Sequence, residues 1–220
     1  MPVDKLYNSA KEALSCISDG DVVGVSGFEG LGEPDSLLRE LSVMNVKNLK
    51  LVFDFPVTRN STGADVITSM CANGKVERLI SCNVPEKFQS SESGLLGNCF
   101  LEIIDRNHIA EKLRITGAGL AGLEFIRPLD GNQELEGIRL DVALIKGLKS
   151  DDLGNVIYLG TQRNWSPVMA MAARTTIAEV TTFVPAGEIN PEGIITPGIY
   201  INRIISVSYT HLTLPTILLV

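Results

Sequence analysis

The stretch "DGDVVGVSGFEGLGEP", residues 19–34, joins an apolar run to a loop with three glycines and then to a proline. The valine-rich run predicts a buried β-strand, because β-branched residues fit a pleated, buried surface. Pro34 predicts the start of a helix, whose apolar face is formed by Leu37, Leu38 and Leu41. A strand, a glycine loop and a helix in this order predict a ligand-binding edge, since backbone amides and a helix N-terminus point outward there.

The remaining chain alternates between predicted strands and helices. An amphipathic helix precedes the glycine loop, with apolar residues from Leu6 to Ile17 and a stop at Asp19-Gly20. The strands are predicted at 49–55, 76–83, 100–104, 140–146, 154–158 and 175–180, and the helices at 64–74, 108–114 and 166–174. Such alternation predicts an α/β fold with a mainly parallel sheet covered by helices. The segment 127–137 is predicted to be a loop.

Length and composition indicate one domain. The 220 residues include 45% hydrophobic and 20% charged residues, which is enough for a buried core, and we expect a single domain at 1–206. Residues 207–220 contain no Asp, Glu, Lys or Arg and show no helical face, so we expect them to be a non-native or disordered tail. A net charge of -7 disfavours nucleic acid and anionic membranes as partners, because both are polyanions.

The cysteine pattern indicates a reducing compartment. The four cysteines, Cys16, Cys71, Cys82 and Cys99, show neither CxxC spacing nor Cys/His ligand spacing, so we expect free buried thiols and no metal site. The N-terminal residues carry acids early and lack a long apolar run, which disfavours a signal peptide or a membrane span. A cytoplasmic location is therefore expected.

The glycine loop is a poor match to nucleotide-binding motifs. Gly27, Gly30 and Gly32 are spaced GxxGxG, whereas the dinucleotide fingerprint is GxGxxG, and no Gly-Lys-Ser or Gly-Lys-Thr follows. Glu29 and Glu33 add negative charge, which is unfavourable for a pyrophosphate. The loop favours a thioester, a carbonyl or another chain as its contact, and a tight turn without any ligand stays open as an alternative.

The opening stretch resembles the signature of the α subunits of family I CoA-transferases. That signature runs Asp-Gly, an apolar run, Gly-Gly-Phe, three residues, Gly, one residue and Pro, and the matching positions are Asp19, Gly20, Gly27, Phe28, Gly32 and Pro34. Ser26 replaces the first glycine of the pair, and Gly24 interrupts the apolar run. Further blocks, among them "AEKLRITGAGLAG", "RLDVALIKGLKSDDLGNVIY" and "RNWSP", follow in the family's order, so the resemblance spans roughly residues 5–205.

The resemblance implies a fold and an activity. The fold is the CoA-transferase (NagB/RpiA-like) fold, a mainly parallel sheet with helices on both faces. The chain would be the α subunit of a hetero-oligomer that moves CoA from an acyl-CoA to a short-chain carboxylate or 3-oxoacid. In this family the thioester is attacked by a glutamate from the β subunit, and an anhydride and a glutamyl-CoA thioester follow. The coenzyme A thioester is then a substrate, no cofactor or metal is implied, and no catalytic nucleophile is expected in this chain.

The resemblance also implies which residues shape the substrate and CoA site. They are Gly27, Phe28, Gly30, Gly32, Pro34, Gly117, Gly119, Arg163 and Asn164. Arg163 and Asn164, in "TQRNWSP" at 161–167, can orient either a ligand or the partner subunit. Trp165 fits an interface anchor or a buried core residue equally well.

Three departures from the family pattern lie where the family contacts its substrate. Arg106 stands where a glutamine donor is usual, and its rigid fork suits carboxylates, so it is a candidate oxyanion or substrate donor. "FDFPVTRNSTG", residues 53–63, replaces Ser-Asn-Asn-Ala-Gly, and Asp54 there fits a ligand-facing acid or a loop cap. The loop after Gly122 is expected to be trimmed, without the family's hairpin. These departures leave one alternative, a catalytically degenerate acyl-CoA-binding or regulatory subunit.

Two further residues invite a catalytic interpretation. Glu92, in "SSESGLLG" at 90–97, resembles the nucleophile motif of the β subunit, but Ser93 replaces its asparagine, and an exposed loop carboxylate is the simpler interpretation. His108 can act as a base, yet a lone histidine at a helix start is more often a surface or capping group. Neither is expected in the site. A nicotinamide oxidoreductase is the weakest alternative.

Overall fold

The computed structural model describes residues 4–57, 61–84, 95–122, 124–127, 131–134 and 136–207. The expectations for Glu92 and for the tail beyond residue 207 lie outside these described residues.

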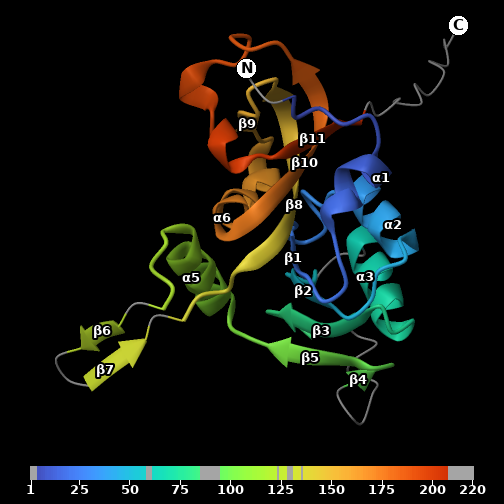
Figure 1. Cartoon of the computed structure of the whole chain (residues 1–220), viewed down its shortest axis with the longest axis vertical. Coiled ribbons are helices and arrows are strands. Elements are labelled where there is room, and N and C mark those ends of the chain that lie inside the picture. The colour runs from blue at the N-terminus through green and yellow to red at the C-terminus, as the bar shows by residue number, and fades with distance from the viewer. Residues whose placement is uncertain are drawn as a thin grey trace, which may run out of the picture.

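Among the described residues, one sheet of nine strands organises the chain (Figure 1). The strands are β1 (Val22–Val25), β2 (Leu49–Phe53), β3 (Val76–Ser81), β4 (Leu95–Leu96), β5 (Cys99–Ile103), β8 (Leu140–Asp151), β9 (Val156–Ile157), β10 (Ala173–Val184) and β11 (Arg203–Ser206). Their order is β11-β10-β8-β1-β2-β3-β5-β4, with β9 paired to β8. The β4–β5 and β8–β9 pairs are antiparallel and the other pairs are parallel, which confirms the predicted mainly parallel sheet.

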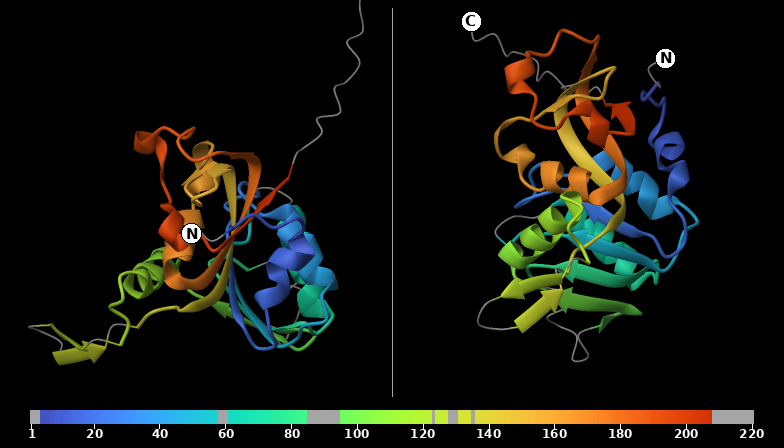
Figure 2. Two further views of the ribbon diagram at one scale, coloured as in Figure 1. Left: turned by 45° about the horizontal axis from the view of Figure 1, so that its top comes forward. Right: turned by 60° about the vertical axis from the view of Figure 1, so that its left-hand side comes forward.

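Helices cover both faces of the sheet (Figure 2). One face carries α1 (Ala10–Ala13), η1 (Leu14–Cys16), α2 (Asp35–Val43) and α3 (Thr62–Ala72), and the other carries α5 (Arg106–Gly117) and α6 (Ser166–Ala172). Alternate residues of β8 serve the two cores, because Val142 and Leu144 pack on the first set and Ala143 and Ile145 on the second. Strands buried on both faces explain the continuous apolar runs in the sequence.

Short turns complete the fold. The 3-10 segment η2 (Gly160–Arg163) lies between β9 and α6, whereas η3 (Pro191–Gly193) and η4 (Gly198–Tyr200) lie between β10 and β11. No helix in the described part of the chain is long and apolar enough to cross a membrane.

The first helix is shorter than the spacing of apolar residues predicts. It begins at Ala10, where the Ser9 hydroxyl caps it by accepting a hydrogen bond from the backbone N–H of Glu12. Leu6 lies before the helix and forms a parallel bridge with Ile204 of β11. Pairing with a strand from the far end of the chain therefore overrides the local helical pattern.

The segment after Gly122 is a hairpin, so the prediction of a loop at 127–137 and of a lost hairpin is wrong. Strands β6 (Glu124–Arg127) and β7 (Gly131–Glu134) pair in an antiparallel two-stranded sheet. This hairpin projects from the side of the molecule that carries α5 (Figure 2). The polar sequence "GNQE" of β7 lacks the apolar alternation by which half-buried strands are recognised.

Candidate functional site

Four strand ends meet at one edge of the sheet. Strand β1 leads into the glycine loop, β2 into Asp54, β3 into Asn83, and β5 into Arg106 at the start of α5. Because these strands are parallel, their carboxyl ends lie at the same edge. Strand β1 also lies between β8 and β2, so the later strands are added outward on both sides of β1. Open parallel sheets bind ligands at such a point, where the strand order reverses.

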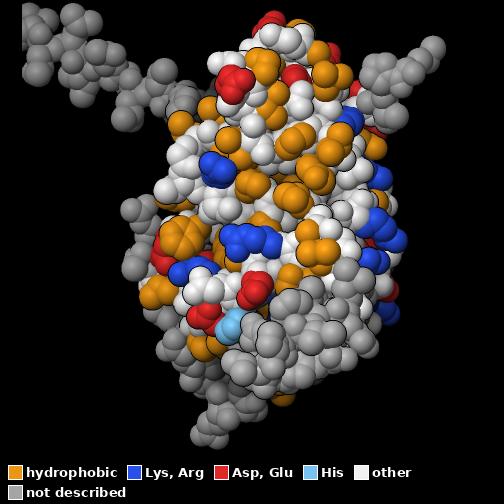
Figure 3. Space-filling model, turned by 90° about the vertical axis from the view of Figure 1, so that its left-hand side faces the viewer, with side chains coloured by type: hydrophobic (Ala, Val, Ile, Leu, Met, Phe, Trp, Pro, Cys, Tyr) orange, Lys and Arg blue, Asp and Glu red, His pale blue; other side chains and the backbone are white. Residues whose placement is uncertain are grey.

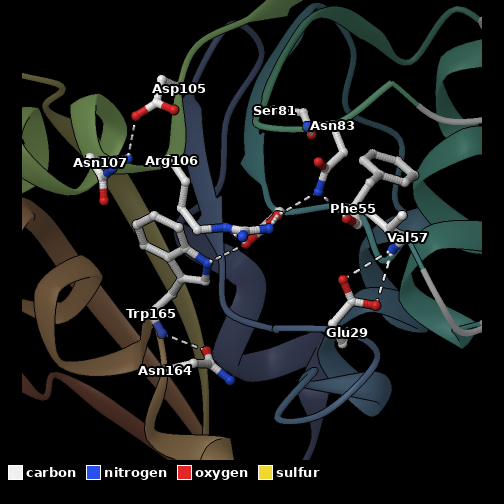
Figure 4. A network of polar contacts seen from close by, with 11 residues as sticks. Glu29, Phe55, Val57, Ser81, Asn83, Asp105, Arg106, Asn107, Asn164 and Trp165 are labelled. Atoms are coloured by element: carbon white, nitrogen blue, oxygen red, sulfur yellow. Dashed lines mark hydrogen bonds and ion pairs between the residues drawn. The ribbon is translucent and has the colours of Figure 1, made fainter.

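The glycine loop closes as a two-residue turn. Phe28 and Leu31 exchange both backbone hydrogen bonds, with N···O distances of 2.9 and 3.0 Å. Glu29 and Gly30 between them have φ values of 50° and 77°, the pattern of a type I′ turn. The Glu29 carboxylate accepts the backbone N–H of Val57 at 3.1 and 3.2 Å, which ties the loop to the segment after β2 (Figure 4).

Protein packing requires two of the loop glycines. Gly32 has a φ of 76°, and a Cβ there would lie 2.8 Å from the backbone oxygen of Gln162. Gly27 has a φ of 151°, and a Cβ there would lie 2.7 Å from Cγ of Glu33. The loop therefore packs directly against the η2 turn and against Glu33, and neither Gly27 nor Gly32 has room for a side chain.

Ser26 and Glu33 fix the two ends of this loop. The Ser26 hydroxyl donates to the carbonyl of Gly32 at 2.8 Å, which gives this departure from the family signature a structural role. Glu33 is buried and accepts from the Ser61 hydroxyl at 2.6 Å and from the backbone N–H of Gly63 at 2.9 Å. Burial raises the pKa of the Glu33 carboxyl, whereas these two hydrogen bonds oppose the rise. This acid thus anchors the loop to the N-terminus of α3.

A buried ion pair lies behind the loop. Lys146 of β8 contacts the carboxylate of Glu179 of β10, and both side chains are almost fully buried. Glu179 also accepts the backbone N–H groups of Ser36 and Leu37, at 2.8 and 3.1 Å, in the first turn of α2. The pair therefore fixes the helix that follows the glycine loop.

Asp54 and Arg106, two of the departures from the family pattern, form one bidentate ion pair. Arg106 Nε lies 2.9 Å from Asp54 Oδ2, and its NH2 lies 3.0 Å from Oδ1. The Asp54 side chain is 3% exposed, whereas that of Arg106 is 42% exposed. The hydrogen bond to Asp54 raises the pKa of Arg106 above its ordinary value, so the guanidinium stays charged.

Two further side chains donate hydrogen bonds to Asp54. The indole N–H of Trp165 donates to Oδ2 at 3.1 Å, and the Asn83 amide donates to Oδ1 at 3.2 Å (Figure 4). The same amide donates to the carbonyl of Phe55 at 2.8 Å. Trp165 is only 6% exposed, so of its two interpretations the buried one is confirmed. It holds Asp54 from the α6 side of the sheet.

Phe28 and Cys82 lie beside the guanidinium of Arg106. On the face of the molecule that Figure 3 shows, basic, acidic and apolar side chains lie close together. The Arg106 Cζ lies 5.0 Å from the centroid of the Phe28 ring, a cation–π contact between the glycine loop and α5. Burial first and the charge of Asp54 second raise the pKa of the half-buried Cys82 thiol to about 12, which Arg106 partly offsets. The exposed part of the guanidinium is thus fixed in place and can donate to a carbonyl or carboxylate oxygen.

The structure brings most of the expected site residues together. Gly27, Phe28, Gly30, Gly32, Pro34, Arg106, Arg163 and Asn164 lie in or beside the glycine loop, η2 and the start of α5. Asn164 donates to the carbonyls of Leu31 at 3.1 Å and Thr161 at 2.8 Å, and so joins η2 to the loop. Pro34 is buried at the start of α2, and Arg163 is exposed.

Gly117 and Gly119 lie apart from this group. They are at the C-terminal end of α5, about 16 Å along the helix from Arg106 at 1.5 Å per residue. A Cβ on Gly117 would lie 2.8 Å from Cβ of Met171, so this glycine allows α5 and α6 to pack closely. Gly119 has a φ of 71° in the turn that ends the helix.

Sequence reasoning missed Asn83 and Cys82, although both directly follow β3 at the edge that carries the site. His108 is 70% exposed on α5, as expected of a surface group. Among the described residues, no group of three or more His, Cys, Asp or Glu side chains is arranged to hold a metal ion.

Comparison with known proteins gives consistent matches over most of the chain. Residues 7–206 match the family model described as Coenzyme A transferase. The chain is 32% identical to one of the subunits of 3-oxoadipate CoA-transferase from Acinetobacter baylyi, covering 94% of this chain and 97% of that one. It is 33% identical to one of the subunits of the probable succinyl-CoA:3-ketoacid coenzyme A transferase from Bacillus subtilis, covering 91% and 89%. The fold is similar to that of glutaconate coenzyme A-transferase from Acidaminococcus fermentans, with a TM-score of 0.74 and 17% identity over 93% of this chain and 76% of that one.

Proposed function

Because the chain belongs to the coenzyme A transferase family, we propose that it is the α subunit of a heteromeric enzyme acting on 3-oxoacids. The enzyme would move CoA between an acyl-CoA and a 3-oxoacid or another short-chain carboxylate. Both relatives described above are named as one subunit of an enzyme, and their names include a 3-oxoacid substrate, which supports both parts of the proposal. A cytoplasmic setting, with its supply of acyl-CoA, suits this activity.

The nucleophile would come from the partner, a β subunit. The acids described at the site edge already have structural hydrogen bonds: Asp54 accepts four, Glu33 accepts two within the protein interior, and Glu29 accepts the N–H of Val57. A carboxylate in such bonds is a poor nucleophile, since attack requires breaking them. A glutamate from the partner, as the family resemblance implies, would attack the thioester and release CoA as the thiolate.

Arg106 would be the donor that this chain contributes to the chemistry, and its fixed geometry is the observation that carries this assignment. Attack on the thioester carbon places negative charge on the former carbonyl oxygen. A guanidinium held by Asp54 and Phe28 needs no reorganisation to stabilise that charge. Loss of one such donor costs on the order of 10²–10³ in kcat.

The test is reconstitution. The chain would be co-expressed with a β subunit of the same family, and CoA exchange would be measured between succinyl-CoA and acetoacetate or 3-oxoadipate. We expect exchange from the complex, none from this chain alone, and a glutamyl-CoA adduct on the β subunit. Arg106→Met, which removes the donor, should lower kcat by about 10²-fold if Arg106 is the oxyanion donor.

Arg78→Met is the matched control for this variant. Arg78 also pairs with a carboxylate, Glu102, and lies over a phenyl ring, Phe100, but on the exposed surface of β3 and β5. Its loss should leave turnover unchanged. A complex that forms but never yields the adduct would contradict the enzymatic proposal.

The alternative is an acyl-CoA-binding or regulatory subunit. The charged Asp54–Arg106 pair favours this alternative, because the pair lies where the family pattern has neutral polar side chains. In that case the complex binds acyl-CoA without exchange, as measured by calorimetry. A gain of exchange in Arg106→Gln would instead identify a divergent enzyme limited by its arginine.

A further inference from the structure

Two of the four cysteines meet in the core, away from the candidate site. Cys71 lies in the last turn of α3 and Cys99 begins β5, and their sulfur atoms are 3.1 Å apart. Both residues are 0% exposed. The other two, Cys16 and Cys82, are half-buried and lie by η1 and Arg106. Sequence spacing does not indicate the 71–99 contact, because 28 positions separate the two residues.

We propose that Cys71 and Cys99 are an intramolecular disulfide-forming pair. A disulfide has an S–S distance of about 2.05 Å, so the two sulfurs need to approach by only about 1 Å. Each thiol loses its hydrogen, a bond forms between the sulfurs, and two electrons and two protons pass to an oxidant. An azodicarboxamide such as diamide accepts both and becomes the hydrazine.

The location of the pair explains how an oxidant reaches it. Contact with Cys99 first and burial second raise the pKa of the Cys71 thiol, which keeps it protonated and unreactive in the closed state. Cys99 pairs with Leu96 of β4, a two-residue strand at the end of the sheet order, and Cys71 is one residue from the end of α3. Short edge strands and helix ends open at low free-energy cost, so local opening exposes both sulfurs.

The bond would join two elements that support the candidate site. The first turn of α3 holds Glu33 of the glycine loop through Gly63, and β5 leads into Arg106. A link between the end of α3 and the start of β5 also restricts the unfolded chain between them. The oxidised protein should therefore be more resistant to unfolding, with its site framework unchanged.

Peptide mapping of the wild-type chain tests the proposal directly. The folded protein would be incubated with diamide a few degrees below its melting temperature, denatured, alkylated with iodoacetamide and digested without reduction. We expect one disulfide, between the peptides of Cys71 and Cys99, with Cys16 and Cys82 alkylated. The same oxidation of the urea-denatured chain should give a mixture of pairings. Recovery of both Cys71 and Cys99 as alkylated thiols, or a mixture from the folded protein, would overturn the proposal.

Thermal unfolding gives a second readout. The oxidised chain should melt about 5–10 °C above the reduced chain, and dithiothreitol should reverse the shift. Cys99→Ala should abolish the shift, whereas Cys16→Ser, the matched control at a half-buried thiol, should keep it. An equal shift in Cys99→Ala would assign the effect to other thiols. The mapping remains decisive even if Cys99→Ala fails to fold.

Discussion

Arg106 contacts both carboxylate oxygens of Asp54, although 52 positions separate the two residues in the chain. Each lies in a stretch that departs from the family pattern, so the two departures are one structural change. A buried carboxylate needs donors, and the arginine supplies two of the four hydrogen bonds that Asp54 receives. The change therefore keeps the buried carboxylate of Asp54 hydrogen-bonded and places a fixed positive charge at this edge of the sheet.

The two residues should be energetically coupled. Arg106→Gln removes both hydrogen bonds that Arg106 donates to the buried Asp54, and we expect a loss of about 1–3 kcal/mol, reduced by the partial exposure of the arginine. Asp54→Asn should destabilise by a similar amount. The double variant restores a neutral pair and should lose about 1 kcal/mol less than the sum. Urea unfolding of the four proteins measures this, and strict additivity would argue against the coupling.

The Cys82 thiol should report the charge balance of the pair. Its pKa is raised to about 12, so alkylation by iodoacetamide should accelerate about tenfold per pH unit between pH 7 and 10. Asp54→Asn removes a negative charge, lowers the pKa and speeds the reaction, whereas Arg106→Gln removes the positive charge and slows it. Cys16, which lies by Arg203 instead, should react at the same rate in all variants. Slower labelling of Cys82 in Asp54→Asn would contradict this electrostatic account.

Trp165 should act as an optical probe of the site, because it is the single tryptophan of the chain and contacts Asp54. Binding of an acyl-CoA next to Arg106 should change its emission in a saturable titration. Trp165→Phe removes the probe and one hydrogen bond of Asp54, and we expect it to cost about 1–2 kcal/mol of stability. A titration by calorimetry with no matching change in emission would place the ligand elsewhere.

Two glycines should respond differently to alanine. In Gly32→Ala the new Cβ meets the backbone of Gln162 and the residue has a positive φ, so we expect a loss of about 2–4 kcal/mol. Gly119→Ala has a similar φ of 71° but no atom within 4 Å, and should lose only about 1–2 kcal/mol. Thermal unfolding compares them. Equal losses would mean that φ alone, and not contact with η2, requires glycine at position 32.

The sequence predicted the parts of the fold that depend on local pattern. The valines of β1, the proline before α2 and the Ser166-Pro167 start of α6 each specify their element through nearby residues. The prediction from sequence failed where the structure depends on pairing between residues that are far apart in the chain. Leu6 has helical spacing but pairs with Ile204.

For the candidate site, the sequence indicated which residues were unusual but not which residues contact one another. Arg106 and Asp54 stood out separately as departures from a family pattern, and neither motif spacing nor periodicity relates positions 54 and 106. Trp165 was ambiguous because burial depends on packing that only the folded chain defines. Gly117 matched a family block, yet its environment is the α5–α6 contact.

The turn at Glu29 and Gly30 has a consequence for the thermodynamics of ligand binding. Its backbone is already held by the Phe28–Leu31 hydrogen bonds, by the Glu29 carboxylate on Val57 and by the η2 turn beneath Gly32. The conformational entropy of ordering this loop is therefore lost when the protein folds and not when a ligand arrives. Preorganisation of this kind implies fast association and little change in backbone amide exchange at residues 26–33 on binding.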